Sequence, residues 1–197
     1  MARRRVLTTW SQGELDGLCG IYAIINAMKI LAMSRGHEFS DHDGARLFRE
    51  LIIYLHKRNV LTSALWDGTS IQHVRDFLHI TRRFMRKKYQ LEIVHKTLAR
   101  KGEITRKDVL WRVLDSALSN GPDYNFKHKT EQARVALLGL GWPQPHWTLA
   151  YGVSEKFINL IDSGRHIRLS YARSTVGYTQ PHKWMIEPEH TIIISTL

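Results

Sequence analysis

The chain has 197 residues, of which 43% are hydrophobic and 24% charged, a composition that argues against disorder and suits one folded domain. Its 29 Lys and Arg against 18 Asp and Glu give a net charge of +11, which favours acidic partners such as nucleic acid, an anionic membrane surface or an acidic protein without selecting among them. One cysteine excludes an internal disulfide and multi-cysteine zinc sites, and no apolar run approaches the roughly 20 residues of a membrane span. At the N-terminus, a basic start is followed by polar residues before any apolar segment long enough for a secretory signal, so we expect a cytoplasmic protein.

The first predicted helix carries the only cysteine. From Gln12 to Leu31 a glycine-rich loop turns into a helix, because apolar residues recur at the i, i+3, i+4, i+7 spacing of a buried stripe: Ile21, Ile24, Ile25, Met28 and Leu31. Cys19 falls in the first turn, where unpaired backbone N–H groups carry partial positive charge and favour a thiolate. A free cysteine is ordinarily a small buried hydrophobe, so Cys19 is a candidate nucleophile only if a base lies beside it.

Three more helices are predicted in the first 121 residues. Capping boxes formed by Ser40 with Asp43, Thr69 with Gln72 and Thr105 with Asp108 precede helically spaced apolar residues, and they predict helices at about 41–57, 70–85 and 105–120. The segment 61–70 is interpreted as a turn-rich connection, and 89–95 as a strand. The basic run at 82–88 is interpreted as a solvated helix face, with nucleic-acid binding as the less favoured alternative.

After Pro122 the sequence changes to short apolar or alternating runs bounded by Gly, Pro, Ser and Asp, as is typical of strands. The runs 133–141, 146–153, 156–162, 166–172 and 190–197 predict a mainly antiparallel sheet. Helices first and strands afterwards is the order of an α+β fold. We therefore expect one domain over 1–197, with a mainly helical part at 1–121 and a sheet part at 122–197.

A nucleophilic thiol needs a base, and the base needs a group that orients it. Of the eleven histidines, His146 opens a predicted strand, and Asp162 ends the next one. If these strands pair as a hairpin, the two side chains are neighbours. Asn159 competes for the orienting role, but strand alternation puts it on the opposite face. A Gln12 amide and the Cys19 backbone N–H would form an oxyanion hole.

Gln12, Asp16, Cys19 and Gly20, followed by the helix IYAIINA, resemble the active-site segment of papain-like cysteine peptidases. Within that superfamily the segment is most similar to the bacterial family that processes double-glycine bacteriocin leaders in ABC exporters, here as a stand-alone domain. That family also has a histidine opening a strand and an aspartate a strand pair later, which His146 and Asp162 match. The resemblance implies a papain-like fold and a Cys-His-Asp site with a Gln oxyanion hole, without metal or organic cofactor.

The leading hypothesis is a cysteine peptidase that cleaves a peptide or isopeptide bond in a peptide or protein substrate. An acidic substrate would suit the positive net charge of the chain. The alternatives are an acyltransferase or transglutaminase-like enzyme with the same triad, and a non-enzymatic basic module that binds nucleic acid or an acidic protein. Candidate groove residues are Trp66, Asp67 and Gly68 in the 61–70 connection, and Trp142 ahead of His146. Core packing is the alternative role of both tryptophans. The oligomeric state is not predicted.

Overall fold

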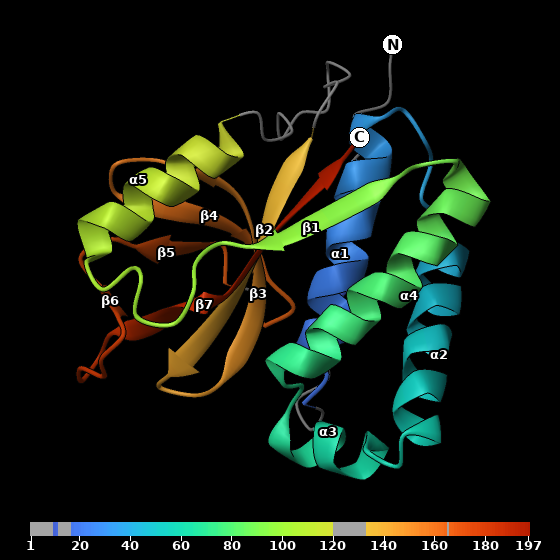
Figure 1. Ribbon diagram of the computed structural model, residues 1–197, viewed down its shortest axis with the longest axis horizontal. Helices are drawn as coiled ribbons and strands as arrows, with labels where there is room; N and C mark the ends of the chain where they lie inside the picture. The colour runs from blue at the N-terminus through green and yellow to red at the C-terminus, as the bar shows by residue number, and fades with distance from the viewer. Residues whose placement is uncertain (1–9, 12–16, 120–132, 165) are drawn as a thin grey trace.

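Helices cover both faces of a sheet in the computed structural model, which describes residues 10–11, 17–119, 133–164 and 166–197 (Figure 1). This part of the chain contains five helices and seven strands. The helices are α1 (Cys19–Ser34), α2 (Asp41–Lys57), α3 (Leu61–Asp67), α4 (Ile71–Tyr89) and α5 (Lys107–Leu118). The strands are β1 (Ile93–Thr97), β2 (Arg134–Trp142), β3 (His146–Val153), β4 (Phe157–Ile161), β5 (Arg168–Ser170), β6 (Ser174–Val176) and β7 (Trp184–Thr196).

The sheet is mainly antiparallel, so the predicted α+β class is confirmed. Its strands follow the order β1-β7-β2-β3-β4-β5, each pair antiparallel, and β6 pairs parallel with β7. The edge strand β1 comes from the mainly helical part of the chain and lies beside the last strand, β7. The two parts of the sequence therefore share one sheet.

Alternate residues of each strand face two separate cores. In β2, Val135 and Leu137 pack in the cluster that contains α1, whereas Ala136 and Leu138 pack in the cluster that contains α5. In Figure 1, α1, α2 and α4 lie on one side of the sheet and α5 on the other. This arrangement leaves the first residue of α1 close to the start of β3.

The predicted stripe of α1 is confirmed, since Ile21, Ile24, Ile25, Met28 and Leu31 are all fully buried. Burial extends around almost the whole helix, because α1 lies between the sheet on one side and α2 and α4 on the other. No helix in the described part of the chain is long and apolar enough to cross a membrane.

Helix α2 has the predicted bounds and the predicted capping box, whereas α4 is capped one residue later than predicted. Its capping box uses Ser70 and His73, not Thr69 and Gln72. Helix α4 also continues to Tyr89, so the predicted strand at 89–95 begins only at Ile93. The observed box thus lies one residue after the predicted one, and the Thr69 side chain instead packs over Gly20, as described below.

Three further expectations need correction. The segment 61–70 is not all turn, because Leu61–Asp67 forms α3. Helix α5 begins after Arg106 without a side-chain cap, and Asp108 pairs with Arg106 and Arg112 instead of closing a box with Thr105. Strand β6 was not predicted. The expected end of α5 near residue 120 lies outside the described residues.

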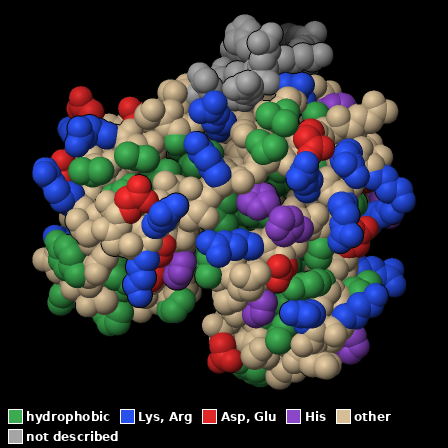
Figure 2. All heavy atoms as spheres, in the orientation of Figure 1, with side chains coloured by type: hydrophobic (Ala, Val, Ile, Leu, Met, Phe, Trp, Pro, Cys, Tyr) green, Lys and Arg blue, Asp and Glu red, His purple; other side chains and the backbone are tan. Residues whose placement is uncertain are grey.

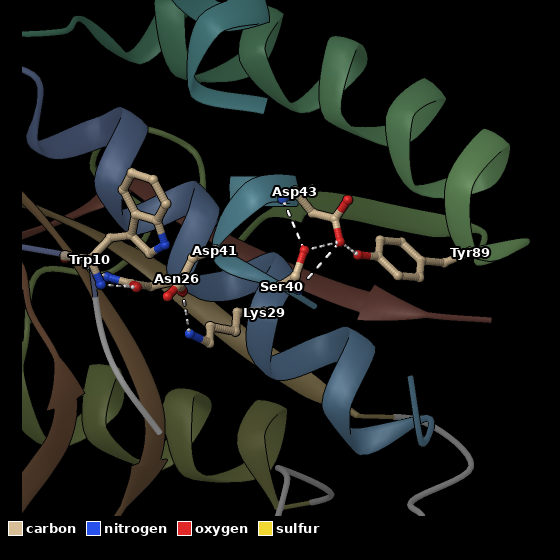
Figure 3. A network of polar contacts seen from close by, with 7 residues as sticks. All are labelled: Trp10, Asn26, Lys29, Ser40, Asp41, Asp43 and Tyr89. Carbon is tan, nitrogen blue, oxygen red and sulfur yellow. Dashed lines mark hydrogen bonds and ion pairs between the residues drawn. The ribbon is translucent and has the colours of Figure 1, made fainter. Parts of the chain in front are cut away.

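A buried carboxylate joins α2 to α4 (Figure 3). Asp43 accepts hydrogen bonds from the Ser40 backbone, the Ser40 hydroxyl and the Tyr89 hydroxyl, and its other oxygen lies 2.8 Å from Lys88 Nζ. Burial raises the pKa of Asp43, but the hydrogen bonds from Lys88, Ser40 and Tyr89 outweigh it and hold the pKa well below its usual range. The carboxylate therefore stays charged inside the helical layer.

A second set of contacts in Figure 3 holds Trp10 against α1. The Trp10 backbone N–H donates to Asn26 Oδ1 at 2.9 Å, and Asn26 Nδ2 donates to the Trp10 carbonyl at 3.1 Å. The indole lies over Gly44, where an added Cβ would come within 2.7 Å of the ring. Beside it, Lys29 pairs with Asp41 at 3.4 Å. The chain that leads toward Cys19 is thus anchored to α1 and α2 at Trp10.

Candidate active site

Cys19 is the first residue of α1 and is buried beside the start of β3. Its sulfur accepts a hydrogen bond from the backbone N–H of Trp147 at 3.3 Å, across 128 residues of sequence. Helix α1 has no side-chain N-cap, since Leu18 occupies the capping position. The first backbone N–H groups of the helix therefore have no carbonyl partner within it. The structure places the thiol at a helix start, as the sequence predicted.

His146 and Asp162 come together as the predicted hairpin requires. Strands β3 and β4 pair antiparallel with Leu149 opposite Ile161, which sets Asp162, the residue after β4, opposite Thr148. His146 lies two residues before Thr148 and therefore on the same face of β3 as Asp162. His146 Nε2 lies 2.6 Å from Asp162 Oδ1. The Asp162 carboxylate is fully buried, and the His146 side chain is 11% exposed. Asn159 instead lies opposite Gly152, farther along the hairpin, so the preference for Asp162 agrees with the register.

The turn after β4 fixes the carboxylate. Asp162 Oδ2 accepts backbone hydrogen bonds from Gly164 at 3.0 Å and His166 at 3.2 Å. A Cβ at Gly164 would approach Asp162 Oδ2 to 3.0 Å and His146 Cε1 to 4.0 Å, so this glycine lets the turn close around the pair. Because both carboxylate oxygens are occupied, Asp162 holds the imidazole in one orientation.

The imidazole faces both a carboxylate and the thiol. Burial lowers the pKa of His146, but its hydrogen bonds to Asp162 and Cys19, together with their negative charges, outweigh burial and raise the pKa to about 9. Burial raises the pKa of Asp162, whereas the hydrogen bond and charge of His146 hold it below its ordinary value. Since Nε2 is directed at Asp162, Nδ1 is the ring nitrogen that remains for Cys19. His146 thus lies within the electrostatic influence of both Asp162 and Cys19.

One predicted groove segment packs directly against the residues around Cys19. The Gly17 backbone N–H donates to the Leu65 carbonyl at 2.7 Å, and a Cβ at Gly17 would lie 2.8 Å from the Gly68 nitrogen. Gly68 has a φ of +85°, which lets the chain turn sharply at the end of α3. Of the three residues predicted here, Gly68 is therefore close to the site. Trp66 is 76% exposed on α3 and Asp67 is the last residue of that helix.

Trp142 lies at the end of β2, on the chain that turns into His146. It pairs with Met185 of β7, is 40% exposed and precedes a cis proline. Trp142 thus lies four residues before His146, and Trp66 lies on α3, whose neighbours Leu65 and Gly68 contact Gly17. No contact of either indole with Cys19 or His146 is seen among the described residues.

Sequence reasoning missed the part played by Trp147. Besides its backbone bond to Cys19, its indole N–H donates to the Thr69 carbonyl at 2.6 Å, and the side chain is buried. Thr69 in turn covers Gly20, where an added Cβ would meet Thr69 Oγ1 at 2.4 Å. Trp147 therefore ties the strand that carries His146 to the segment that covers the start of α1. No local sequence pattern indicates these contacts, because they join residues 128 and 78 positions apart.

His166 is a second residue that the sequence did not single out. Its ring lies edge-on to His146 with 6.5 Å between centroids, and it contacts Trp184 with 5.2 Å between centroids. Gln12 and Asp16, in contrast, lie outside the described residues. In the part of the chain that the structure describes, no three His, Cys, Asp or Glu side chains gather as they would around a metal ion.

A scan of the chain against models of protein families finds no match, and a search among curated proteins finds no similar sequence. The geometry around Cys19, His146 and Asp162 is therefore the evidence for its chemistry.

Proposed function

We propose that the protein is a cysteine peptidase, a thiol hydrolase that cleaves a peptide or isopeptide bond. The observation that carries the proposal is a buried carboxylate bonded to an imidazole, with a thiol at a helix start bonded by the backbone N–H of the residue next to that imidazole. A nucleophile, a base and a group that orients the base are the three parts that acyl transfer through sulfur requires.

In the proposed reaction Cys19 Sγ attacks the carbonyl carbon of the substrate, and His146 Nδ1 takes the thiol proton. The high pKa of His146 favours the state in which the ring holds that proton, ready to pass to the leaving group. The proton then passes from Nδ1 to the leaving amine, the C–N bond breaks, and an acyl-thioester remains on Cys19. Water, deprotonated by Nδ1, cleaves the thioester and releases the acid.

The developing oxyanion needs fixed donors. The Cys19 backbone N–H supplies one, since it lies at the first residue of α1 and has no carbonyl partner within the helix. The Gln12 side-chain amide is proposed as the other. We include a papain-like fold in the same proposal. Its support is that α1 begins at Cys19 and packs on the antiparallel sheet, in which His146 is the first residue of β3.

The test uses the fact that the chain has a single cysteine. The protein is treated with a peptide carrying a thiol-reactive electrophile, and intact mass reports the adduct over time. We expect one adduct in the parent protein, none in Cys19→Ala, and a rate at least tenfold lower in His146→Ala. Asn159→Ala serves as the control, since Asn159 lies off the site, and its labelling rate should be unchanged.

Equal labelling rates in the parent protein and His146→Ala would contradict the proposal, because the thiol would then react without its base. Turnover is followed separately with a peptide library, with and without a competing amine. Free acid as the product in both conditions supports hydrolysis, whereas an amide of the added amine would show acyl transfer instead.

A further inference from the structure

A second surface of the molecule, over α4 and β1, is strongly basic. Figure 2 shows Lys, Arg and His side chains gathered over these two elements. We define the α4 basic face by its exposed cations, which are Arg75, Arg82, Arg83, Arg86, Lys87, Lys96, Arg100 and Lys101.

Few carboxylates neutralise this face. Arg82 pairs with Glu92, but among the described residues the other cations of the face have no carboxylate within 4.0 Å. Arg75 hydrogen-bonds the Thr97 hydroxyl at 3.4 Å, and Glu103 accepts from the Arg100 backbone and not from its guanidinium. The positive charge therefore remains available to a ligand.

Two histidines, His79 and His95, lie among the cations of the α4 basic face, and one of them responds to the positive charge. The rings of His79 on α4 and His95 on β1 lie 5.3 Å apart between centroids. Burial lowers the pKa of His95, and the nearby His79, Arg82 and Arg75 lower it further. These charges all lie on α4, and they act on His95 of the neighbouring strand β1.

The cations extend along the length of α4. Helix α4 has 19 residues, and at about 1.5 Å per residue Arg75 and Lys87 are separated by roughly 18 Å along its axis. Each strand of a duplex presents one phosphate per roughly 3.4 Å, so this length matches about five phosphates. A regular polyanion can therefore meet several of these cations at once.

Hollows lie on both sides of α4. One, of about 660 Å³, lies between α4, the 98–103 turn and β7, and its cations are Arg75, Arg100 and Lys101, with Glu103 and Glu189 on its rim. The other, of about 300 Å³, lies between α2 and α4. Of its cations, Arg46 pairs with Glu50 and Lys88 with Asp43, which leaves Arg83 and Lys87 without a carboxylate partner among the described residues. A ligand along α4 thus meets concave basic surface on either side of the helix.

The face lacks the apolar side chains that other acidic partners would need. Among the described residues, the large exposed hydrophobic side chains are Ile53, Trp66, Trp142, Ile167, Tyr178 and Leu197, and none is on α4 or β1. A helix that lies on a membrane inserts apolar residues, and the centre of a protein–protein interface is rich in aromatic ones. Arginines without either suit contacts to phosphates, which position a nucleic acid without reading its bases.

We propose that the α4 basic face binds the phosphodiester backbone of a double-stranded nucleic acid without sequence specificity. This function is independent of the chemistry at Cys19. Binding here would hold the protein on a nucleic acid while the site at the start of α1 stays open.

The test measures binding of the full chain to a fluorescent 20-base-pair DNA duplex of mixed sequence by anisotropy, from 50 to 200 mM NaCl. The variant Arg75→Gln/Arg83→Gln/Arg86→Gln/Lys87→Gln removes four cations of the face. At 100 mM NaCl it should bind more than tenfold more weakly, and the slope of log K against log salt should fall by about 3 to 4. An RNA duplex of the same sequence tells which polymer binds more tightly.

The control variant Arg112→Gln/Lys156→Gln/Arg173→Gln/Lys183→Gln has the same net charge as the first variant but changes α5 and the turns near β4 to β7. Its affinity for the duplex should fall by less than threefold. Cys19→Ala should bind as the parent does, so failure of the peptidase proposal would leave this one standing. Equal losses in both quadruple variants would overturn the proposal, as would absent binding. Competition by polyglutamate or anionic vesicles as strong as that by unlabelled duplex would also overturn it.

Discussion

The His146–Asp162 pair makes a prediction about stability against pH. The pKa of His146 is about 9 in the folded protein against an ordinary 6.5. At about 1.4 kcal/mol for each pH unit, this difference amounts to about 3 kcal/mol of the free energy of unfolding. Because the folded pKa is the higher one, this stability is fully present below pH 6.5 and is lost as the pH rises through about 9.

Asp162→Asn should remove most of this contribution. An amide keeps the shape of the carboxylate but not its charge, so burial, which lowers the pKa of His146, is left opposed only by Cys19. The variant should be less stable than the parent protein. The difference between their free energies of unfolding should be about 2 to 3 kcal/mol larger at pH 6 than at pH 10. Cys19→Ala should give a smaller difference, since Cys19 contributes less to the raised pKa than Asp162.

Urea denaturation, followed by tryptophan fluorescence, measures the stability at each pH, and NMR of the imidazole Cε1–H group measures the pKa of His146 directly. His146→Gln assigns the signal among the eleven histidines. Asp115→Asn, which removes an exposed carboxylate on α5, serves as the control and should leave the titration unchanged. A midpoint near 6.5 in the parent protein, or one that Asp162→Asn does not lower, would refute the reasoning.

Other substitutions test the packing that holds the site. Gly20→Ala should lower the free energy of unfolding by about 1 to 3 kcal/mol, because its Cβ would lie 2.4 Å from Thr69 Oγ1, and adding Thr69→Ala should restore part of that stability. Gly152→Ala is the control in the same thermal melts and should be close to neutral, because its Cβ would meet no atom nearer than 3.7 Å. Trp147→Phe leaves the buried Thr69 carbonyl without its donor and should cost about 1 to 3 kcal/mol, with a rise in KM for any peptide substrate that Gly152→Ala does not cause. Asp43→Asn should destabilise the protein by a similar amount at pH 7, and since the folded pKa of Asp43 is lowered, the deficit measured in urea should shrink as the pH falls below about 4. A deficit that stays constant to pH 2 would show that the charge of Asp43 is not the cause.

The features that sequence reasoning predicted correctly depend on contacts between residues close in the chain. The periodicity of α1, the capping box of Ser40 with Asp43 and the hairpin of β3 with β4 are all local. His146 and Asp162 are only 16 residues apart, and a two-residue period with an antiparallel pairing is enough to bring them together.

The features that were missed depend on distant contacts. Helix α3 has seven residues and no side-chain cap, and its Leu65 carbonyl is bonded by Gly17 from another part of the chain. Strand β6 has three residues and pairs parallel with β7, which no local pattern indicates. The cap of α4 is Ser70 and not Thr69, whose carbonyl is bonded by Trp147, nearly 80 residues away. Short elements of this kind are decided by tertiary packing and not by propensity.

The register of the sheet is what joins the two halves of the site. His146 and Trp147 are adjacent in β3 and direct their side chains to opposite faces, so that the imidazole bonds Asp162 and the indole bonds Thr69. A slip of one residue would exchange their faces and break both sets of contacts. The pairing of Trp147 with Gly139 opposes such a slip, because Gly139 leaves room for the His190 backbone and side chain, which a Cβ there would approach to 2.5 Å. The glycine on β2 thus helps to set where the base and the thiol meet, although it touches neither.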